Sequence, residues 1–275
     1  MEVRARLGTM KELEEVLGAM RGMAAARIQQ GERAQVAARE YAARIGAAFA
    51  SLSTEGSPAA PPSSGRPART LVVALCTERG FVGALNEHVL RAAREGPQPH
   101  DVLVVGARGL AFAREQGLTV TYVGNMATHL AGLGDVADQI GDLLLTRMDA
   151  SEPLIADVIY PRRTPTGGAV IERQRLLPID LPSRAYLGDF PPITMLPVPI
   201  LAAQIAIEYV RARLFEFVAE TFAAANAARL EVLQAAHAHL DEMLLGLRRT
   251  ENVLRQEEIT AEVLEVITGR MTGSA

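Results

Sequence analysis

The opening segment EVRARLGTMKELEEVLGAMRGMAAARI, residues 2–28, sets the architecture that we expect for this chain. No proline interrupts it, or the sequence that follows up to Ser53, so a single helix can continue throughout. A helix of about 50 residues would be about 75 Å long and needs a partner along its length. On its own the segment is compatible with a long surface helix or a homodimeric coiled coil. Its apolar residues recur every three or four positions, close to a heptad: Val3, Leu7, Met10, Leu13, Leu17, Met20, Ala24 and Ile28.

The other end of the chain carries a second striped segment, which runs from about Pro199 to Arg270 without an internal proline. As a helix of about 70 residues it would be about 105 Å long. Two such stripes are buried most simply against each other, as an antiparallel pair within one chain. Because the second segment is longer than the first, we expect part of it to extend beyond the pair or to pack on the middle of the chain.

The middle of the chain alternates between strand and helix patterns. The helical stretches lie near Gly83–Glu95, Arg108–Gln116 and Gly134–Met148. Strands separated by crossover helices predict a mainly parallel sheet that is covered on both faces. The last two strands are joined by PRRTPTGG, which is too short for a crossover helix, so they should form an antiparallel hairpin at a sheet edge. The predicted strands are Leu71–Cys76, Val102–Ala107, Thr119–Gly124, Pro153–Tyr160 and Ala169–Ile179.

We therefore predict an α/β protein in which long N- and C-terminal helices form an antiparallel coiled coil and carry a central Rossmann-like α/β domain with a mainly parallel sheet. The stretch GSPAAPPSSGRP, Gly56–Pro67, is rich in Pro, Ser and Gly and predicts an exposed linker. The predicted domains are an N-terminal helix at 1–55, a linker at 56–69, the α/β domain at 70–192 and a C-terminal helix at 193–275.

Composition narrows the functional classes. Hydrophobic residues make up 49% of the 275 residues, aromatic residues only 4%, and the net charge is −4. This balance indicates a globular chain whose apolar surface is buried by aliphatic side chains, and it gives no support to nucleic-acid binding. No apolar run is long enough to span a bilayer, and the N-terminus does not resemble a signal peptide. The single cysteine, Cys76, excludes a disulfide framework and favours a reducing compartment.

Few patterns in the sequence indicate chemistry. The chain lacks a phosphate-binding G-x-x-x-x-G-K-[ST] loop, and its single lysine, Lys11, lies in the first helix. His237 and His239 lie on different helix faces, so we expect no metal site. We also expect no cofactor and no catalytic residue. The turn ERGFVGALN, Glu78–Asn86, opens a helix after the first strand. Such a turn can hold an anion, but we favour the interpretation that its glycines serve only a tight turn. Arg255 and Gln256 form a polar pair that should point away from the helix interface and could bind a partner's carboxylate.

Three motifs resemble the gamma subunit of F-type ATP synthases. Ala19–Ile28 resembles that family's A-M-x-x-V-A-A-S-K-M stretch, and Glu78–Asn86 resembles D-R-G-L-C-G-G-L-N. Arg255–Ile267 resembles R-Q-A-x-I-T-x-E-L-x-E-I-V. The resemblance covers nearly the whole chain in the expected order, although the middle matches loosely.

This resemblance implies a non-catalytic rotor shaft inside a ring of three alpha and three beta subunits, which also binds the epsilon subunit and stands on the membrane c-ring. Membrane association would then occur through partners only, at the cytoplasmic face of a bacterial cell membrane. By the match, Arg255 and Gln256 take the place of a pair that contacts a beta-subunit loop, and Arg27 takes the place of a family lysine near the same region. The partner-contact residues that the resemblance implies are Met20, Met23, Arg27, Arg79, Arg255, Gln256, Ile259 and Thr260.

The chain departs from the family pattern at Arg27, at Phe81–Val82 and at Glu257–Glu258. These departures indicate a divergent branch, a class that includes alternative bacterial complexes that pump Na⁺ rather than H⁺. Two other interpretations remain open. One is a Rossmann-like nucleotide-binding enzyme, which a dinucleotide bound at the Gly80–Gly83 turn would favour. The other is a coiled-coil scaffold, in which the end helices of two chains, rather than of one chain, would pair.

Overall fold

Both ends of the chain are helical, as the proline-free stripes predict. The computed structural model describes residues 2–52, 68–95, 101–148, 153–165, 167–179 and 193–272, so most of the predicted linker at 56–69 lies outside the described residues. The terminal helices are α1 (Glu2–Leu52) and α5 (Val198–Thr272). The chain divides into two compact units. Unit 1 comprises residues 1–23 with 231–275, and unit 2 comprises residues 24–230.

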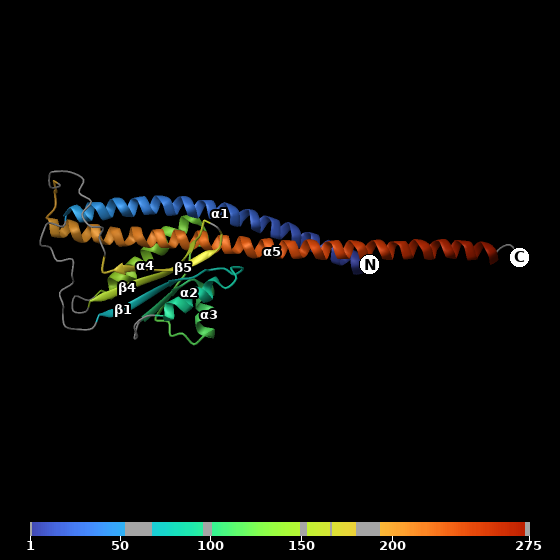
Figure 1. Ribbon diagram of the computed structural model, residues 1–275, viewed down its shortest axis with the longest axis horizontal. Helices are drawn as coiled ribbons and strands as arrows, with labels where there is room; N and C mark the ends of the chain where they lie inside the picture. The colour runs from blue at the N-terminus through green and yellow to red at the C-terminus, as the bar shows by residue number, and fades with distance from the viewer. Residues whose placement is uncertain are drawn as a thin grey trace. The chain divides into compact units, whose positions relative to one another are not determined.

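Unit 2 contains a five-stranded sheet in the order β3-β2-β1-β4-β5. Figure 1 labels β1, β4 and β5 of this sheet. The first four strands run parallel and β5 pairs antiparallel with β4 at the edge, which confirms the predicted mixed topology. The third strand is shorter than predicted, because it is an edge strand that pairs only with three residues of β2. The strands are β1 (Arg69–Leu75), β2 (Asp101–Val105), β3 (Tyr122–Gly124), β4 (Leu154–Arg163) and β5 (Ala169–Leu177).

Helices cover both faces of this sheet because its central strands are apolar on both sides. On one face, Val72 and Ala74 of β1 pack against α2 (Leu85–Arg94) and α3 (Ala107–Glu115). On the other face, Leu71, Val73 and Leu75 pack against α4 (Leu133–Arg147) and α5. Successive residues of a strand point to opposite faces, so a single apolar run serves both cores.

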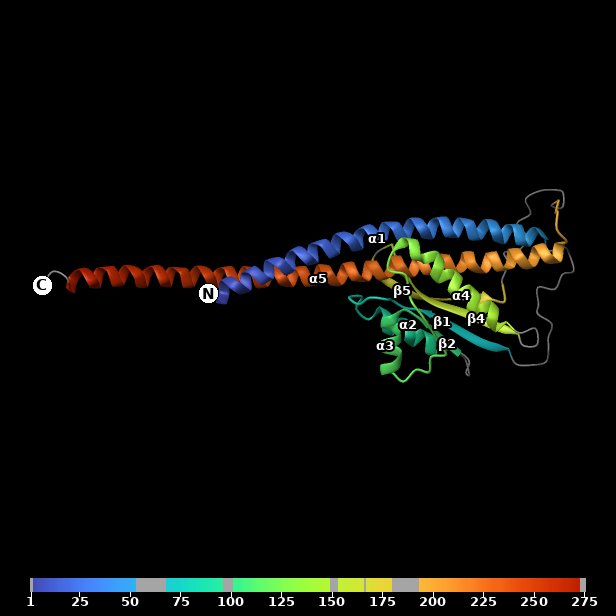
Figure 2. The same ribbon diagram turned by 180° about the vertical axis from the view of Figure 1, so that it is seen from behind.

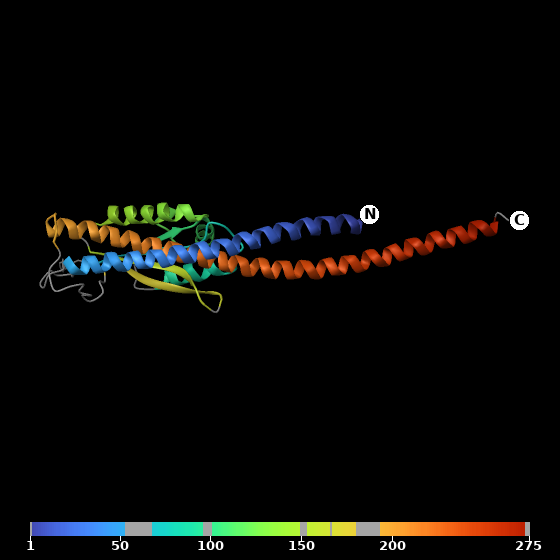
Figure 3. The same cartoon turned by 90° about the horizontal axis from the view of Figure 1, so that it is seen from above.

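Part of the C-terminal helix covers the sheet. Leu214, Phe217 and Val218 of α5 are buried in the same core as the sheet, and the ring of Tyr160 on β4 stacks on Phe217 with centroids 4.7 Å apart. Helix α4 lies beside this stretch of α5, as Figure 2 and Figure 3 show, and Arg211 Nη2 donates to Asp142 Oδ1 at 2.9 Å. The expectation that some of the longer helix packs on the central domain is therefore confirmed.

Within unit 2, α1 and α5 form an antiparallel pair. Gly31 packs directly on α5, where a Cβ would lie 2.9 Å from the Ala223 Cβ. Farther along α1 the contacts move back along α5: Arg39 Nε donates to Glu216 Oε1 at 2.9 Å, and Tyr41 OH donates to Glu208 Oε1 at 2.7 Å. Rising numbers on one helix meet falling numbers on the other, so the two segments run in opposite directions.

Unit 1 contains the same antiparallel arrangement near the chain ends. Leu7 of α1 is buried against Leu240 and Leu244 of α5, with Met10 and Leu17 packed around them. The predicted intramolecular pairing of the opening and closing segments is thus present in each unit. Among the described residues, we find no helix that is both long and apolar enough to cross a bilayer.

Candidate functional surfaces

The turn after β1 is held by its own polar side chains. Asn86 accepts a hydrogen bond from the Thr77 backbone N–H at 2.9 Å and donates one to Thr77 Oγ1 at 2.9 Å. Gly83 has a φ of +55°, a conformation that favours glycine. The glycine-bearing motif therefore builds a tight strand-to-helix turn, which is the structural alternative considered for it above.

Glu78 occupies the place in this fold where a phosphate would be expected. The carboxyl ends of parallel strands and the following helix N-terminus form the usual anion site of such sheets. Here Glu78 Oε2 accepts hydrogen bonds from the backbone N–H of Ala107, at the start of α3, at 3.1 Å and from that of Met126 at 2.9 Å. The Glu78 carboxylate already accepts hydrogen bonds from these two donors, and its negative charge would repel a phosphate. This argues against the nucleotide-enzyme interpretation.

The same turn packs on α5 within unit 2. Val82 and Leu85 are buried against Ala225. Arg229, one turn farther along α5, donates from Nε to the Gly80 carbonyl oxygen at 3.3 Å and from Nη1 to Asn226 Oδ1 at 2.8 Å. These contacts fix the orientation of the turn relative to α5. The exposed side chain of Arg79, which the turn carries, therefore has a defined position.

Three arginines from three segments line one pocket in unit 2, and we call them the arginine cluster: Arg27 of α1, Arg79 of the turn and Arg229 of α5. Burial lowers the pKa of Arg229, and the positive charges of Arg27 and Arg79 lower it further. Cations held this close favour a negatively charged partner, and guanidinium groups match carboxylates in geometry. The pocket also contains Glu78, whose carboxylate is taken up by the two backbone donors described above.

The structure thus brings together two of the predicted partner-contact residues, Arg27 and Arg79. Sequence reasoning missed Arg229, although an arginine that interrupts the small apolar run of residues 222–230 was a usable signal. Both Arg79 and the predicted residue Met23 are exposed, the latter by 51%, whereas Arg27 and Met20 are half-buried. Met20 and Met23 belong to unit 1, whereas the arginine cluster belongs to unit 2.

The far end of α5 in unit 1 presents a second surface, which we call the distal segment, residues 252–264. Every side chain in this segment is exposed. Arg255 and Gln256 are among them, as are Ile259 and Thr260, and the Thr260 hydroxyl donates to the Gln256 carbonyl oxygen at 2.7 Å. The apolar side chains are exposed as well, with Val253 at 54%, Val263 at 50% and Leu264 at 58%. Several exposed apolar side chains on one helical segment are typical of a surface that binds another protein.

Comparison with known proteins gives a consistent result along the whole chain. A family model described as ATP synthase matches residues 1–272. The chain is similar to the ATP synthase gamma chain of Hyphomonas neptunium, at 26% identity over 98% of this chain and 97% of that one. It is also similar to the gamma chain of Paracoccus denitrificans, at 28% identity over 98% and 97% of the two chains.

Solved structures share the fold. A chain in the mitochondrial ATP synthase of Euglena gracilis, from a structure of OSCP, F1 and the c-ring, superimposes with a TM-score of 0.63 at 18% identity, over 98% of this chain and 93% of that one. A chain from the rotor of the same enzyme superimposes with a TM-score of 0.62 at 16% identity, over 94% and 97% of the two chains.

Proposed function

This chain belongs to the ATP synthase family, and from that premise we propose that it is the central rotor shaft of a rotary ATP synthase. It would turn inside a ring of three alpha and three beta subunits and connect that ring to the ion-driven c-ring of the membrane sector. The epsilon subunit would bind the α/β domain and the nearby part of the helix pair. The chain itself would carry out no catalysis, and H⁺ or Na⁺ would be the coupled ion.

The observation that carries this proposal is the combination of an intramolecular antiparallel helix pair with an exposed distal segment. Two packed helices resist bending and twisting better than one. The pair differs around its circumference, because its two helices have different sequences. When such a shaft turns inside a threefold ring, it presents a different face to each of three equivalent sites and biases their conformational equilibria in turn.

The helix pairing also bears on the scaffold interpretation. A dimeric scaffold would bury the two stripes between chains, but Gly31 and Ala223, and likewise Leu7 and Leu240, meet within one chain. In unit 1, the distal segment leaves several apolar side chains exposed. We infer that Met20 and Met23 on α1, and Arg255, Gln256, Ile259 and Thr260 on α5, contact the alpha and beta subunits.

The arginine cluster suits a second contact. Three guanidinium groups around one pocket would bind an acidic loop of a ring subunit, and the exposed side chain of Arg79 is the one that such a loop would reach first. In a bacterium the assembled complex would hold this chain at the cytoplasmic face of the cell membrane through its partners.

The distal contact is tested in the reconstituted complex with the double variant Arg255→Ala and Gln256→Ala. Loss of two hydrogen-bonding side chains at about 1 kcal/mol each would weaken the contact about 30-fold, so we expect ATP-driven ion pumping per ATP hydrolysed to fall. The matched control is Arg248→Ala with Arg249→Ala, which removes two exposed arginines of the same helix. Unchanged coupling in the first variant would remove the role assigned to Arg255 and Gln256.

The arginine-cluster contact is tested separately by Arg79→Glu, with Arg91→Glu on the exposed side of α2 as control. Charge reversal at Arg79 should weaken co-purification with alpha and beta subunits at low salt, and the difference from the unmodified chain should shrink as salt is raised, because salt screens the charges. Equal recovery of the complex with both variants would show that the cluster is not a contact.

A further inference from the structure

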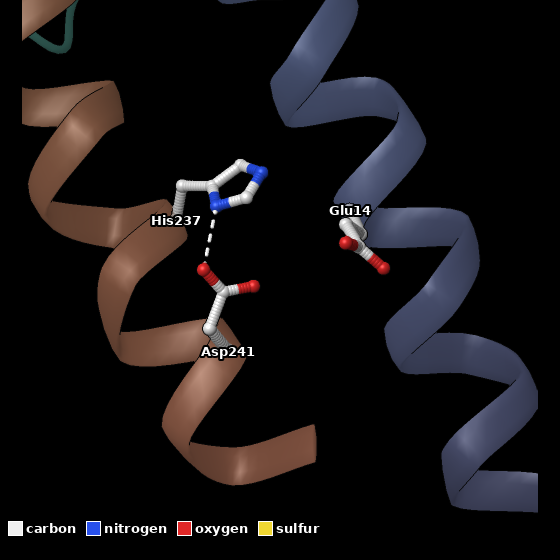
Figure 4. A group of neighbouring side chains, drawn as sticks. All are labelled: Glu14, His237 and Asp241. Atoms are coloured by element: carbon white, nitrogen blue, oxygen red, sulfur yellow. Dashed lines mark hydrogen bonds and ion pairs between the residues drawn. The ribbon is translucent and has the colours of Figure 1, made fainter. Parts of the chain in front are cut away.

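Three potential metal ligands from two helices converge in unit 1. His237 and Asp241 lie four residues apart on α5, and Glu14 reaches toward them from α1 (Figure 4). One ligand atom from each residue can be chosen so that all three lie within 4.8 Å of one another. His237 Nδ1 and Asp241 Oδ2 are 3.1 Å apart. Glu14 and His237 are half-buried, and Asp241 is exposed.

The donor set is one that transition-metal ions use. An imidazole and two carboxylates suit Zn²⁺ and neighbouring divalent ions of the first transition row, whereas Ca²⁺ and Mg²⁺ prefer oxygen ligands alone. Residues at i and i+4 face the same side of a helix, so His237 and Asp241 can bind one ion without any change of backbone. A tetrahedral ion holds neighbouring ligand atoms about 3.4 Å apart. Small rotations of the two carboxylate side chains would bring the three groups to that spacing.

Glu14 distinguishes this arrangement from an ordinary ion pair. A histidine and an aspartate at i and i+4 form a common helix-surface pair that needs nothing from a second helix. Glu14, however, has no hydrogen-bond or ion-pair partner of its own in the described part of the chain, and one of its carboxylate oxygens lies within 4.8 Å of a ligand atom of each member of the pair. Two carboxylates beside one imidazole repel each other unless a cation lies between them, and a divalent ion would supply that charge.

We propose that Glu14, His237 and Asp241 form a binding site for a divalent transition-metal ion such as Zn²⁺, with water in the remaining coordination position. The bound ion links α1 to α5 within unit 1 and opposes separation of the two helices. It therefore stabilises the part of the chain that carries the distal segment. The site shares no residue with the proposed contacts with ring subunits, and the test below measures binding alone, so its failure would leave the proposed function untouched.

The test is titration of the untagged, EDTA-dialysed full chain with ZnCl₂ in a calorimeter, with Co²⁺ absorption as a second probe of direct coordination. We expect one ion per chain, and visible Co²⁺ bands of a four- or five-coordinate site. The variants Glu14→Gln, His237→Asn and Asp241→Asn should each weaken Zn²⁺ binding by at least about tenfold, because each removes one ligand. Circular dichroism of each variant establishes that the helices are retained.

Two neighbouring substitutions are matched controls. His239→Asn removes an exposed histidine two residues from the site, and Glu15→Gln removes an exposed carboxylate beside Glu14. Both should bind Zn²⁺ as the unmodified chain does. Undetectable binding by the unmodified chain would overturn the proposal. Equal loss with His239→Asn would also do so, as would full binding by Glu14→Gln, since the ion would then be held by α5 alone.

Discussion

Arg39 on α1 donates from Nη2 to Glu220 Oε1 on α5 at 2.7 Å, and this pair connects the two helices within unit 2. The Glu220 side chain is only 2% exposed, whereas that of Arg39 is 58% exposed. Gln35 donates to the same oxygen at 2.5 Å, while Glu220 Oε2 is buried without a partner in the described residues. Arg39 also binds Glu216, which has a second partner in Arg213, so in the described residues Glu220 depends on Arg39 as its paired arginine.

Replacement of Arg39 should destabilise unit 2 more than replacement of an ordinary exposed arginine would. Arg39→Ala leaves Glu220 buried without its paired counter-charge, whereas Glu216 keeps Arg213. We expect a loss of about 1–3 kcal/mol in the free energy of unfolding, reduced from a fully buried pair by solvent screening. Urea unfolding monitored by circular dichroism measures it. Arg33→Ala, an exposed arginine of the same helix, should change stability by less than about 0.5 kcal/mol. Similar values for both would mean that the buried carboxylates are solvated by other means.

Glu220 should also give the fold a distinctive dependence on pH. Burial raises the pKa of Glu220 above its ordinary value of 4.5, and the nearby Glu216 carboxylate raises it further, while Gln35 and Arg39 lower it. The folded state therefore holds this proton more tightly than the unfolded state does. The stability that results is fully present below about pH 4.5 and is lost as pH rises through the folded pKa.

The variant Glu220→Gln isolates this effect, because an amide does not titrate. Stability of the unmodified chain relative to Glu220→Gln should fall as pH rises from about 4.5, and urea midpoints between pH 4 and pH 8 measure the difference. The exposed site Glu40→Gln supplies the control curve. A difference that stays flat across this range would show that Glu220 keeps its ordinary pKa in the folded chain.

The two long helices can be predicted from the sequence, but the buried charged residues between them cannot. Apolar spacing predicts α1 and α5, because a helix stripe of that length has to be covered. Antiparallel packing within one chain is the simplest way to cover both stripes, but the spacing itself also allows pairing between chains. Glu216 and Glu220 interrupt the stripe of α5, and Gln35 and Arg39 show the same four-residue spacing on α1. That two such pairs face each other depends on the register between the helices, which no local pattern sets.

Of the two candidate surfaces, one could likewise be predicted from the sequence and the other could not. Arg255 and Gln256 could be identified from a local motif, since the distal segment presents its residues without help from the rest of the chain. The arginine cluster could not, because Arg27, Arg79 and Arg229 come from three segments that only the fold brings together. Glu78 belongs to a motif identified from the sequence, yet its hydrogen bonds to Ala107 and Met126 depend on the order of the strands.

Close approach of the helices in unit 2 depends on Gly31. A Cβ at this position would lie 2.9 Å from the Ala223 Cβ and 3.2 Å from the Ala223 Cα, and backbone cannot move aside cheaply. Gly31→Ala should therefore destabilise the chain by about 1–3 kcal/mol from overpacking, offset by about 1 kcal/mol of helix propensity. Gly22→Ala on the same helix meets nothing within 4 Å and should stabilise it by up to about 1 kcal/mol. Opposite signs in thermal unfolding support the contact, and a stabilising Gly31→Ala contradicts it.

Cys76 should be inert to thiol reagents in the folded chain. It lies fully buried at the end of β1, and burial raises the pKa of its thiol to about 12. At pH 8 the thiolate fraction falls from about one in ten, for an ordinary thiol of pKa near 9, to about one in ten thousand. Reaction with Ellman's reagent at pH 8 should be very slow in buffer and complete within minutes in guanidinium chloride.

The variant Cys76→Ala with Thr9→Cys, which moves the single thiol to an exposed site on α1, should react rapidly in both. Rapid reaction of native Cys76 would mean that α3 separates readily from the sheet, because Gly109 packs directly against this side chain.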